Sequence, residues 1–221
     1  MSVAQAVQLG RAASLARRES PKLSGEAKMQ TPQLFNEYWD STYGDCSPIG
    51  YLLRNALPER WVRFHSLPES KRYADDESEC LIILERQNAV LSALSPRNAD
   101  LVFISCGYSE SVDPSRTEAE LNVVDPTAQF WRTIVQNEED DYKNYWHPFM
   151  SVWPWTTGAF DSILRLVADN TIAHTLIVNP KDHWVFHPYD GGVDVILRSV
   201  DERNQLKRKF QAWLSQRSDG L

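Results

Sequence analysis

The stretch that decides the fold is His183–Leu197, with the sequence HWVFHPYDGGVDVIL. Its first half, His183–Tyr189, is rich in aromatic and β-branched residues, which suit a pleated, half-buried surface. Its second half, Val193–Leu197, is apolar apart from one aspartate. Between the halves, Asp190-Gly191-Gly192 is typical of a tight turn whose residues take positive φ angles. The stretch therefore predicts a β-hairpin.

A third strand is expected just before the hairpin. Thr171–Val178 reads TIAHTLIV, and the turn-forming residues Asn179-Pro180-Lys181-Asp182 close it. Together the three strands predict an antiparallel meander. Pro188 lacks an amide donor, so we expect its strand to lie at an edge there or to carry a bulge.

The rest of the chain contains helix and strand signals that can be built onto this meander. Thr31 followed by Pro32 is a typical helix start, and Asp76 and Glu79 have the spacing of a capping pair. Such signals predict helices over 32–39, from about 47 to 58 and from about 76 to 94, strands over 61–67 and 101–105, a helix over 160–167, and a last helix capped by Ser199. Residues 125–160 show no clear pattern before that helix begins.

These elements predict an α+β fold. We expect a mixed, mainly antiparallel sheet with a C-terminal β-meander, and helices packed mostly on one face. A chain of 221 residues suits one domain, which we place at 31–221. Residues 1–30 are poor in large apolar side chains and are expected to form a flexible N-terminal extension.

Composition limits the partners and the compartment. The formal net charge of -7 argues against nucleic acid as a partner and favours a basic one. No stretch approaches the length of a membrane span, so no membrane partner is expected. The three cysteines, Cys46, Cys80 and Cys106, form no CxxC pair, and the N-terminus shows no apolar run of the length that a secretory leader needs, so secretion is not expected. These features indicate a reducing, cytoplasmic location.

A dense polar group surrounds the end of the strand at 61–67. A cleft for an anionic or bidentate ligand would use such residues, because the arginine fork pairs with carboxylate or phosphate. The alternative is internal pairing between the group's arginines and the hairpin's carboxylates, of which Asp194 interrupts an apolar strand. The candidate binding residues here are Arg63, His65, Glu69, Lys71, Arg72, Asp190 and Asp194.

A second candidate surface combines acidic and aromatic residues. Four carboxylates precede a segment dense in tyrosine and tryptophan, and together they could form a surface for a basic protein. The alternatives are a solvated charged face and a loop folded back over the core. The candidate binding residues are Glu138, Glu139, Asp140, Asp141, Tyr145 and Trp146.

Signals for catalysis and metal binding are weak. His183 and His187 have the spacing of a helical zinc pair, but on a strand four residues span roughly 13 Å, too far to share one ion. Cys106 ends a buried strand and could be a nucleophile, although a free cysteine more often serves as a small apolar core residue. We predict no catalytic residue, no metal site and no cofactor.

Two stretches together carry a family resemblance. Trp61–Asn88, which includes RFHSLPESKRY, and His183–Ser199, which includes HPYDGGVDVI, are followed by a C-terminal helix ending in WLSQRSDGL. In this combination the chain resembles an uncharacterised bacterial family, a domain of unknown function. The resemblance covers about a quarter of the chain and implies a bacterial, cytosolic α+β protein. By analogy with small acidic bacterial proteins, it also suggests an immunity-like role.

The preferred interpretation is a non-enzymatic protein-binding module, immunity-like, that sequesters a basic partner. The alternative is a small-molecule-binding protein or an enzyme with a cleft around Arg63, His65 and Arg72, beside the hairpin at 183–198.

Overall fold

A computed structural model describes residues 31–116, 118–136, 143–217 and 220. Within these residues, eight strands form one sheet in the order β1-β8-β7-β6-β2-β5-β3, and β4 also pairs with β5. Every strand pairing is antiparallel. The strands are β1 (Trp61–His65), β2 (Asp100–Ser109), β3 (Gln129–Phe130), β4 (Ile134–Gln136), β5 (Asn144–Pro154), β6 (Thr175–Asn179), β7 (Trp184–Tyr189) and β8 (Gly192–Ile196).

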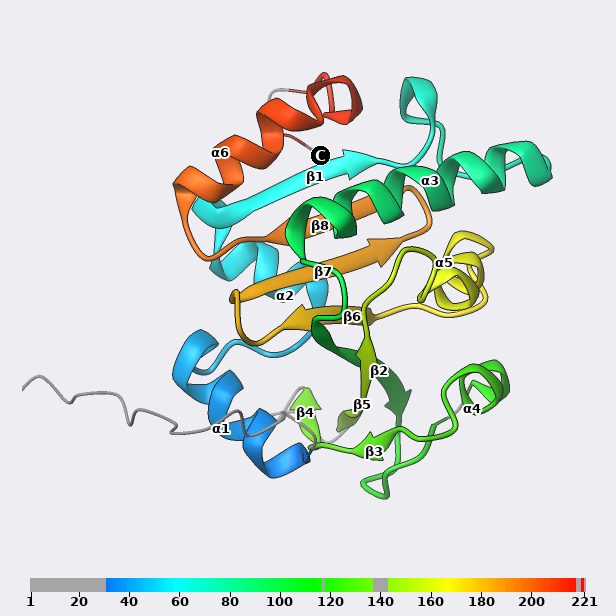
Figure 1. The fold of residues 1–221 in the computed structure, drawn as a ribbon. Coiled ribbons are helices and arrows are strands. Elements are labelled where there is room, and N and C mark those ends of the chain that lie inside the picture. Colours follow the sequence, from blue (N-terminus) through cyan, green and yellow to red (C-terminus); the bar gives the residue numbers. More distant parts are fainter. Residues whose placement is uncertain (1–30, 117, 137–142, 218–219, 221) are drawn as a thin grey trace, which may run out of the picture.

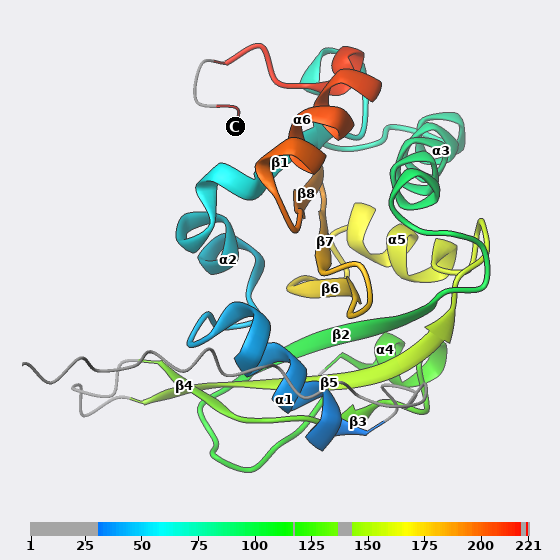
Figure 2. The same cartoon turned by 60° about the vertical axis from the view of Figure 1, so that its left-hand side comes forward.

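Six α-helices accompany the sheet in the described part of the chain. They are α1 (Pro32–Tyr43), α2 (Gly50–Ala56), α3 (Glu77–Leu94), α4 (Ala119–Val124), α5 (Asp161–Ala168) and α6 (Val200–Lys209). Short 3-10 turns lie at Pro58–Arg60, Pro68–Ser70 and Gln211–Trp213. Figures 1 and 2 show that the sheet is strongly twisted, because β2 and β5 run at a steep angle to β7 and β8.

The helices divide between the two faces of the sheet (Figure 2). Helices α3, α4, α5 and α6 contribute to one apolar cluster with side chains such as Phe64, Phe103 and Phe186. Helices α1 and α2 contribute to a second cluster on the opposite face, with Val102, Ile104 and others. The predicted α+β fold is therefore confirmed, and most of the helices share one face. The strands lying between the two clusters are buried on both sides.

The predicted helix caps are confirmed. The side chain of Thr31 accepts a hydrogen bond from the backbone N–H of Leu34 at the start of α1. Asp76 and Ser199 do the same for the N–H groups of Glu79 and Glu202. Each cap satisfies a backbone donor that would otherwise have no partner at a helix N-terminus.

The predicted meander is also present, because β6, β7 and β8 pair in succession. Pairing of β7 with β6 ends at Phe186, while pairing with β8 continues to Tyr189. Pro188 thus lies where the β6 side of β7 is open, in agreement with the local edge predicted from its missing donor.

The reason for the glycines in the hairpin differs from the prediction. Positive φ angles occur at other glycines of the described chain, such as Gly44, but not at Gly191 or Gly192. Gly192 is required instead by close approach: a Cβ there would lie 2.2 Å from the backbone oxygen of Phe64 on β1. The glycine lets two strands come together rather than permitting a left-handed turn.

The largest difference from the sequence analysis lies in residues 125–160. The aromatic segment is not a loop over the core but the long strand β5 (Asn144–Pro154), which pairs with β2 from Tyr145 to Pro154. Likewise β2 is longer than the strand predicted over 101–105, because its pairing with β5 continues to Ser109. Burial of β5 on both faces removes the alternation that would have revealed a strand.

Candidate functional site beneath helix α2

A row of polar and aromatic side chains crosses the sheet beneath α2. Arg63, Asp194 and His187 occupy paired positions on the neighbouring strands β1, β8 and β7. Side chains directly opposite on paired strands share one face of a sheet, so these three form a continuous cross-strand row. On the same face, Cys106 of β2 and Trp146 of β5 form a small apolar cluster with Ile49, the N-cap of α2.

Asp194 is the centre of this row. Its side chain is only 2% exposed, and Arg63 binds it through two nitrogens, Nε at 2.7 Å and Nη2 at 2.9 Å. Arg54 of α2 adds a longer contact of 3.5 Å from Nη1 to Oδ2. A carboxylate removed from water needs such partners, since an unpaired buried charge is strongly unfavourable. The predicted alternative of internal pairing therefore describes Arg63 and Asp194.

The arginines of this network are also held by aromatic rings. The guanidinium of Arg63 lies 4.6 Å from the ring centre of Tyr189. Arg54 and Arg63 each lie 5.7 Å from the ring of Trp61. Such cation–π contacts add attraction in a partly desolvated place, so the network fixes α2 to the β1 end of the sheet.

His187 brings α2 close to the sheet. A Cβ at Gly50 would lie 2.1 Å from Nδ1 of His187, so only glycine fits at the start of α2. The nearest oxygen of Asp194 is 4.0 Å from this Nδ1, beyond hydrogen-bond distance. Burial lowers the pKa of His187 to about 4, although Asp194 opposes that shift. His187 is therefore neutral at pH 7 and serves as packing beneath the helix.

The other hairpin candidates form surface pairs. Asp190 accepts a hydrogen bond from Nε of Arg72 at 2.8 Å, and the Arg72 side chain is 63% exposed. Lys71 pairs with Asp75 and Glu79. Asp190 itself is only 9% exposed, but each pair has a member in contact with solvent, and pairs open to solvent in this way contribute little to stability.

Two further candidate residues, Glu69 and His65, lie outside the network of Arg63 and Asp194. Glu69 is exposed and has a positive φ of 55°. His65 is half-buried, and burial lowers its pKa. Its backbone oxygen accepts a hydrogen bond from Arg86. The predicted polar group is therefore not a single site, and only Arg63 and Asp194 belong to the buried network.

Cys106 lies in an apolar environment. It is 3% exposed and packs with Ile49 and Trp146. Burial raises the pKa of its thiol to about 12, which disfavours the thiolate that a nucleophile requires. The structure thus supports the interpretation of Cys106 as a small core residue.

We expect Cys106 to resist alkylation in the native protein. At pH 8 a thiol with a pKa of about 12 has a thiolate fraction on the order of a thousandfold below that of an ordinary cysteine. Iodoacetamide labelling followed by peptide mapping should show Cys46, which is partly exposed, modified well before Cys106. In denaturant all three cysteines should react alike. Equal native rates for Cys46 and Cys106 would contradict the buried, protonated thiol.

Of the acidic and aromatic candidates for a protein-binding surface, only the aromatic ones lie among the described residues. Glu138, Glu139, Asp140 and Asp141 lie outside the described residues. Trp146 is 7% exposed and donates its indole N–H to Gln136 at 2.8 Å, so it belongs to the interior rather than to a surface. Tyr145 is partly exposed, opposite Val135 of β4 and Ser109 of β2.

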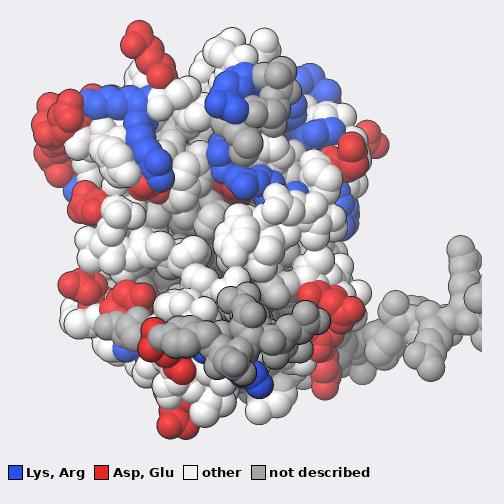
Figure 3. Space-filling view, turned by 180° about the vertical axis from the view of Figure 1, so that it is seen from behind, with Lys and Arg blue, Asp and Glu red and all other residues white. Residues whose placement is uncertain are grey.

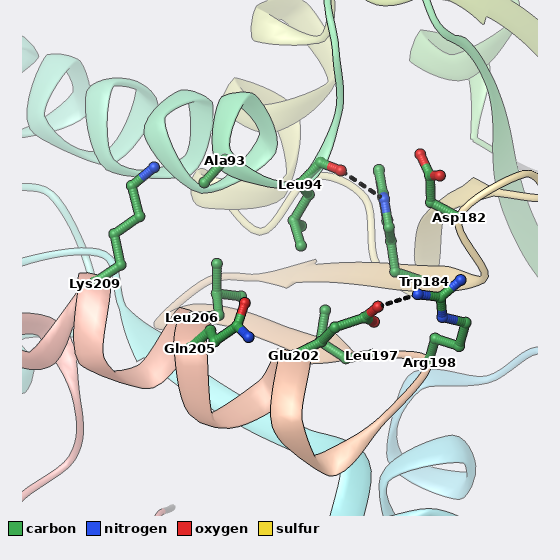
Figure 4. A pocket seen from close by; sticks show the side chains of 10 residues that line it. All are labelled: Ala93, Leu94, Asp182, Trp184, Leu197, Arg198, Glu202, Gln205, Leu206 and Lys209. Carbon is green, nitrogen blue, oxygen red and sulfur yellow. Dashed lines mark hydrogen bonds and ion pairs between the residues drawn. The ribbon is translucent and has the colours of Figure 1, made fainter.

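Several surface cavities of the described chain have the size of small-molecule sites. One, of about 470 Å³, lies along β5 beside Met150 and Val152. Of two others, the first, of about 400 Å³, lies between the end of α3 and α6 (Figure 4). Trp184 and Leu206 help to line it, and Arg198 and Glu202 form an ion pair at its rim. The second, of about 380 Å³, lies at the outer edge of β1 and includes Arg63. It does not include His65, Arg72 or Asp190, so the cleft expected around those residues is not the cavity that forms.

Sequence reasoning missed several residues of these sites. Arg54 approaches Asp194 only because α2 crosses the sheet, and no local pattern indicates that crossing. Arg203 and Lys207 line the cavity at the β1 edge, and their spacing of four on a predicted helix was an available signal. In the described part of the chain, no group of three or more His, Cys, Asp or Glu is arranged to hold a metal ion.

The fold and the buried network define an α+β protein with a fully antiparallel sheet whose polar row is covered by a short helix. The chain belongs to the family described as "Domain of unknown function (DUF3885)", whose model matches residues 49–218. Neither the curated proteins nor the solved structures contained a match to the chain. None of the described helices has both the length and the apolar character needed to cross a membrane.

The family match begins at the N-cap of α2 and therefore excludes α1. Nevertheless, Phe35, Tyr38 and Trp39 of α1 are buried in the second apolar cluster. The region N-terminal to the matched residues thus completes the core on the α2 face.

Proposed function

We propose that this protein is a non-enzymatic binding module that sequesters a basic protein partner, in the manner of an immunity protein. The proposal is supported by an exposed apolar surface where β2, β4 and β5 meet α2. On the face that α2 covers, Tyr108 is 46% exposed and Tyr51 is 36% exposed. Exposed aromatic and aliphatic side chains that gather in one place are typical of protein interfaces. We call Tyr51 and Tyr108, with the partly exposed Gln136 of β4 that binds Tyr51, the β4 surface.

Contacts between elements hold the β4 surface together. The hydroxyl of Tyr51 accepts a hydrogen bond from Gln136, which ends β4. Tyr108 packs edge-on against Trp146 at 5.2 Å between ring centres. Because its supporting residues are buried or paired, the surface is preorganised, which lowers the entropic cost of binding.

The charge of the surrounding sequence supports a basic partner. The four carboxylates at 138–141 lie in the sequence between Gln136 and Asn144, which end β4 and begin β5. Carboxylates near an apolar contact surface speed association with a basic partner, while the apolar groups slow its dissociation.

The test is binding kinetics with a partner recovered from native cells. Neutralising Glu138, Glu139, Asp140 and Asp141 to the amides should slow association several-fold at low salt. The effect should shrink near 0.5 M salt, where the Debye length falls to roughly 4 Å. Tyr108→Ala should mainly speed dissociation, since loss of a central contact acts on residence time.

The matched control is Val123→Ala, because Val123 is 80% exposed on α4, away from the β4 surface. This variant should bind like the wild type. The proposal is wrong if the four-fold neutral variant associates at the wild-type rate at low salt and Tyr108→Ala behaves like Val123→Ala.

A further inference from the structure

The cavity at the outer edge of β1 is strongly cationic. Its volume is about 380 Å³, within the range of small-molecule sites. The described residues that line it include four cations, Arg63, Arg203, Lys207 and Arg217, against one carboxylate, Glu59. Figure 3 shows Lys and Arg side chains gathered on the upper part of the corresponding face. This concentration contrasts with the net charge of -7 for the whole chain.

The cations differ in how their charge is already used. Both Nε and Nη2 of Arg63 bind Asp194, so much of that charge is neutralised inside the protein. Arg203 and Lys207 stand four residues apart on α6 and therefore share one side of the helix. They are the positive charges that α6 adds to the cavity.

Two donors of the lining lack a hydrogen-bond acceptor. Nε of Arg203 and Nε1 of Trp61 are buried and make no hydrogen bond with the described residues. Both residues line the cavity. A buried donor without an acceptor is unfavourable, and such groups often indicate a ligand or an ion. Neither nitrogen is accessible to water, so a bound oxyanion would reach it only after a local shift of the side chains that cover it.

We propose that this cavity binds a small organic anion that carries a phosphate group. Arginine pairs with oxyanions through its planar fork, and lysine adds a compact charge, so the lining suits phosphate oxygens. A phosphate monoester has nearly two negative charges, which match a multiply cationic lining better than a single carboxylate does. The volume leaves space for an organic part beside Trp61 and Leu214.

The cationic cavity and the proposed protein interface are formed by different residues. The cavity is formed by β1, α6 and the segment that follows α6, whereas the β4 surface lies on β2, β4 and α2. A loss of partner binding would therefore leave the phosphate site unchanged, and the two proposals can fail separately.

The probe is inorganic phosphate, added to the full chain at constant ionic strength with chloride as the reference. Phosphate should raise the thermal midpoint with a saturable dependence on concentration, because a ligand of the native state stabilises it. Succinate, a dicarboxylate with at least as much negative charge at pH 7.5, should stabilise the protein less. Ribose 5-phosphate should bind more tightly than inorganic phosphate, because its organic part fills the remaining volume.

Two substitutions identify the site. Arg203→Gln and Lys207→Gln should each weaken phosphate binding about tenfold, measured by calorimetry, because each removes a charged hydrogen-bond donor. Arg208→Gln is the matched control, because Arg208 is exposed on the same helix and does not line the cavity. It removes the same charge and should change the affinity less than twofold.

Lys207→Gln provides an independent test if Arg203→Gln fails to fold. The site assignment is overturned if phosphate and chloride give the same midpoint, or if Lys207→Gln and Arg208→Gln change phosphate affinity equally. Equal binding of succinate and phosphate would overturn the assignment of a phosphate-bearing ligand.

Discussion

Gly192→Ala should destabilise the protein by about 3 kcal/mol, because the added methyl group cannot be accommodated without separating two strands. The new Cβ would lie 2.2 Å from the backbone oxygen of Phe64 and 2.9 Å from the hydroxyl of Tyr189. A side chain could rotate away, but a backbone oxygen within the β1–β8 ladder cannot move without loss of pairing. The measurement is the free energy of unfolding from chemical denaturation.

The neighbouring glycine is the control. A Cβ at Gly191 would lie 3.0 Å from Cε2 of Tyr189, a side-chain atom that can shift. Its φ lies outside the left-handed region, so alanine also restricts the unfolded chain at little cost to the folded one. Gly191→Ala should therefore change the stability by less than about 1 kcal/mol. Equal losses at the two positions would contradict the steric role of Gly192 and favour a requirement of the turn itself.

These glycines show which part of the hairpin was predictable. The Asp-Gly pair and the β-rich flanks depend on local chemistry, so the turn and its strands could be placed from the sequence alone. The need for glycine at 192 comes from Phe64, which is distant in the sequence. The position of the hairpin turn was predicted correctly, but the reason given for its glycines, a positive φ angle, was wrong.

Helix starts were predictable for the same local reason. Thr31, Asp76 and Ser199 accept hydrogen bonds from residues three positions later, a relation that the sequence itself displays. No tertiary contact is needed to recognise it. By contrast, α4 is short and has no side-chain cap, and it was not predicted.

The missed strand β5 illustrates where local rules fail. Pro148 interrupts it, and a proline normally argues against a central strand. Its oxygen accepts a hydrogen bond from Trp131, on the side away from β2. Since the N–H and C=O of a strand residue point the same way, the missing donor leaves the pairing with β2 intact. Only the arrangement of neighbouring strands makes this proline acceptable.

The candidate site was partly predictable. Asp194 was noticeable as a charge in an apolar strand, and pairing with Arg63 was one of two interpretations. The sequence could not choose between pairing and a ligand site, because that choice depends on the register of β1 against β8. Arg54 reaches the carboxylate from a helix 140 residues earlier in the chain.

Asp194→Asn should have the second large effect, a loss of about 3–5 kcal/mol, because it removes the buried charge that binds Arg63 and Arg54. Asparagine keeps the shape of the side chain, so the change tests charge rather than packing. The matched control is Asp190→Asn in the same hairpin, whose partner Arg72 is mostly exposed. This control should cost about 1 kcal/mol or less.

Removing the partner together with the carboxylate gives a sharper test. In Arg63→Met/Asp194→Leu the strongest charge pair is replaced by apolar side chains, and such replacements of buried pairs are often tolerated. The double variant should therefore be more stable than Asp194→Asn, with a coupling free energy of about 1–3 kcal/mol between the two positions in a double-mutant cycle. The cycle uses the single variants Arg63→Met and Asp194→Leu, and the contact of Arg54 with Asp194 cancels from the coupling because both variants with leucine at position 194 lack it. If Asp194→Asn costs no more than Asp190→Asn, the carboxylate is not needed to neutralise the arginines, and the network beneath α2 does not hold the helix to the sheet.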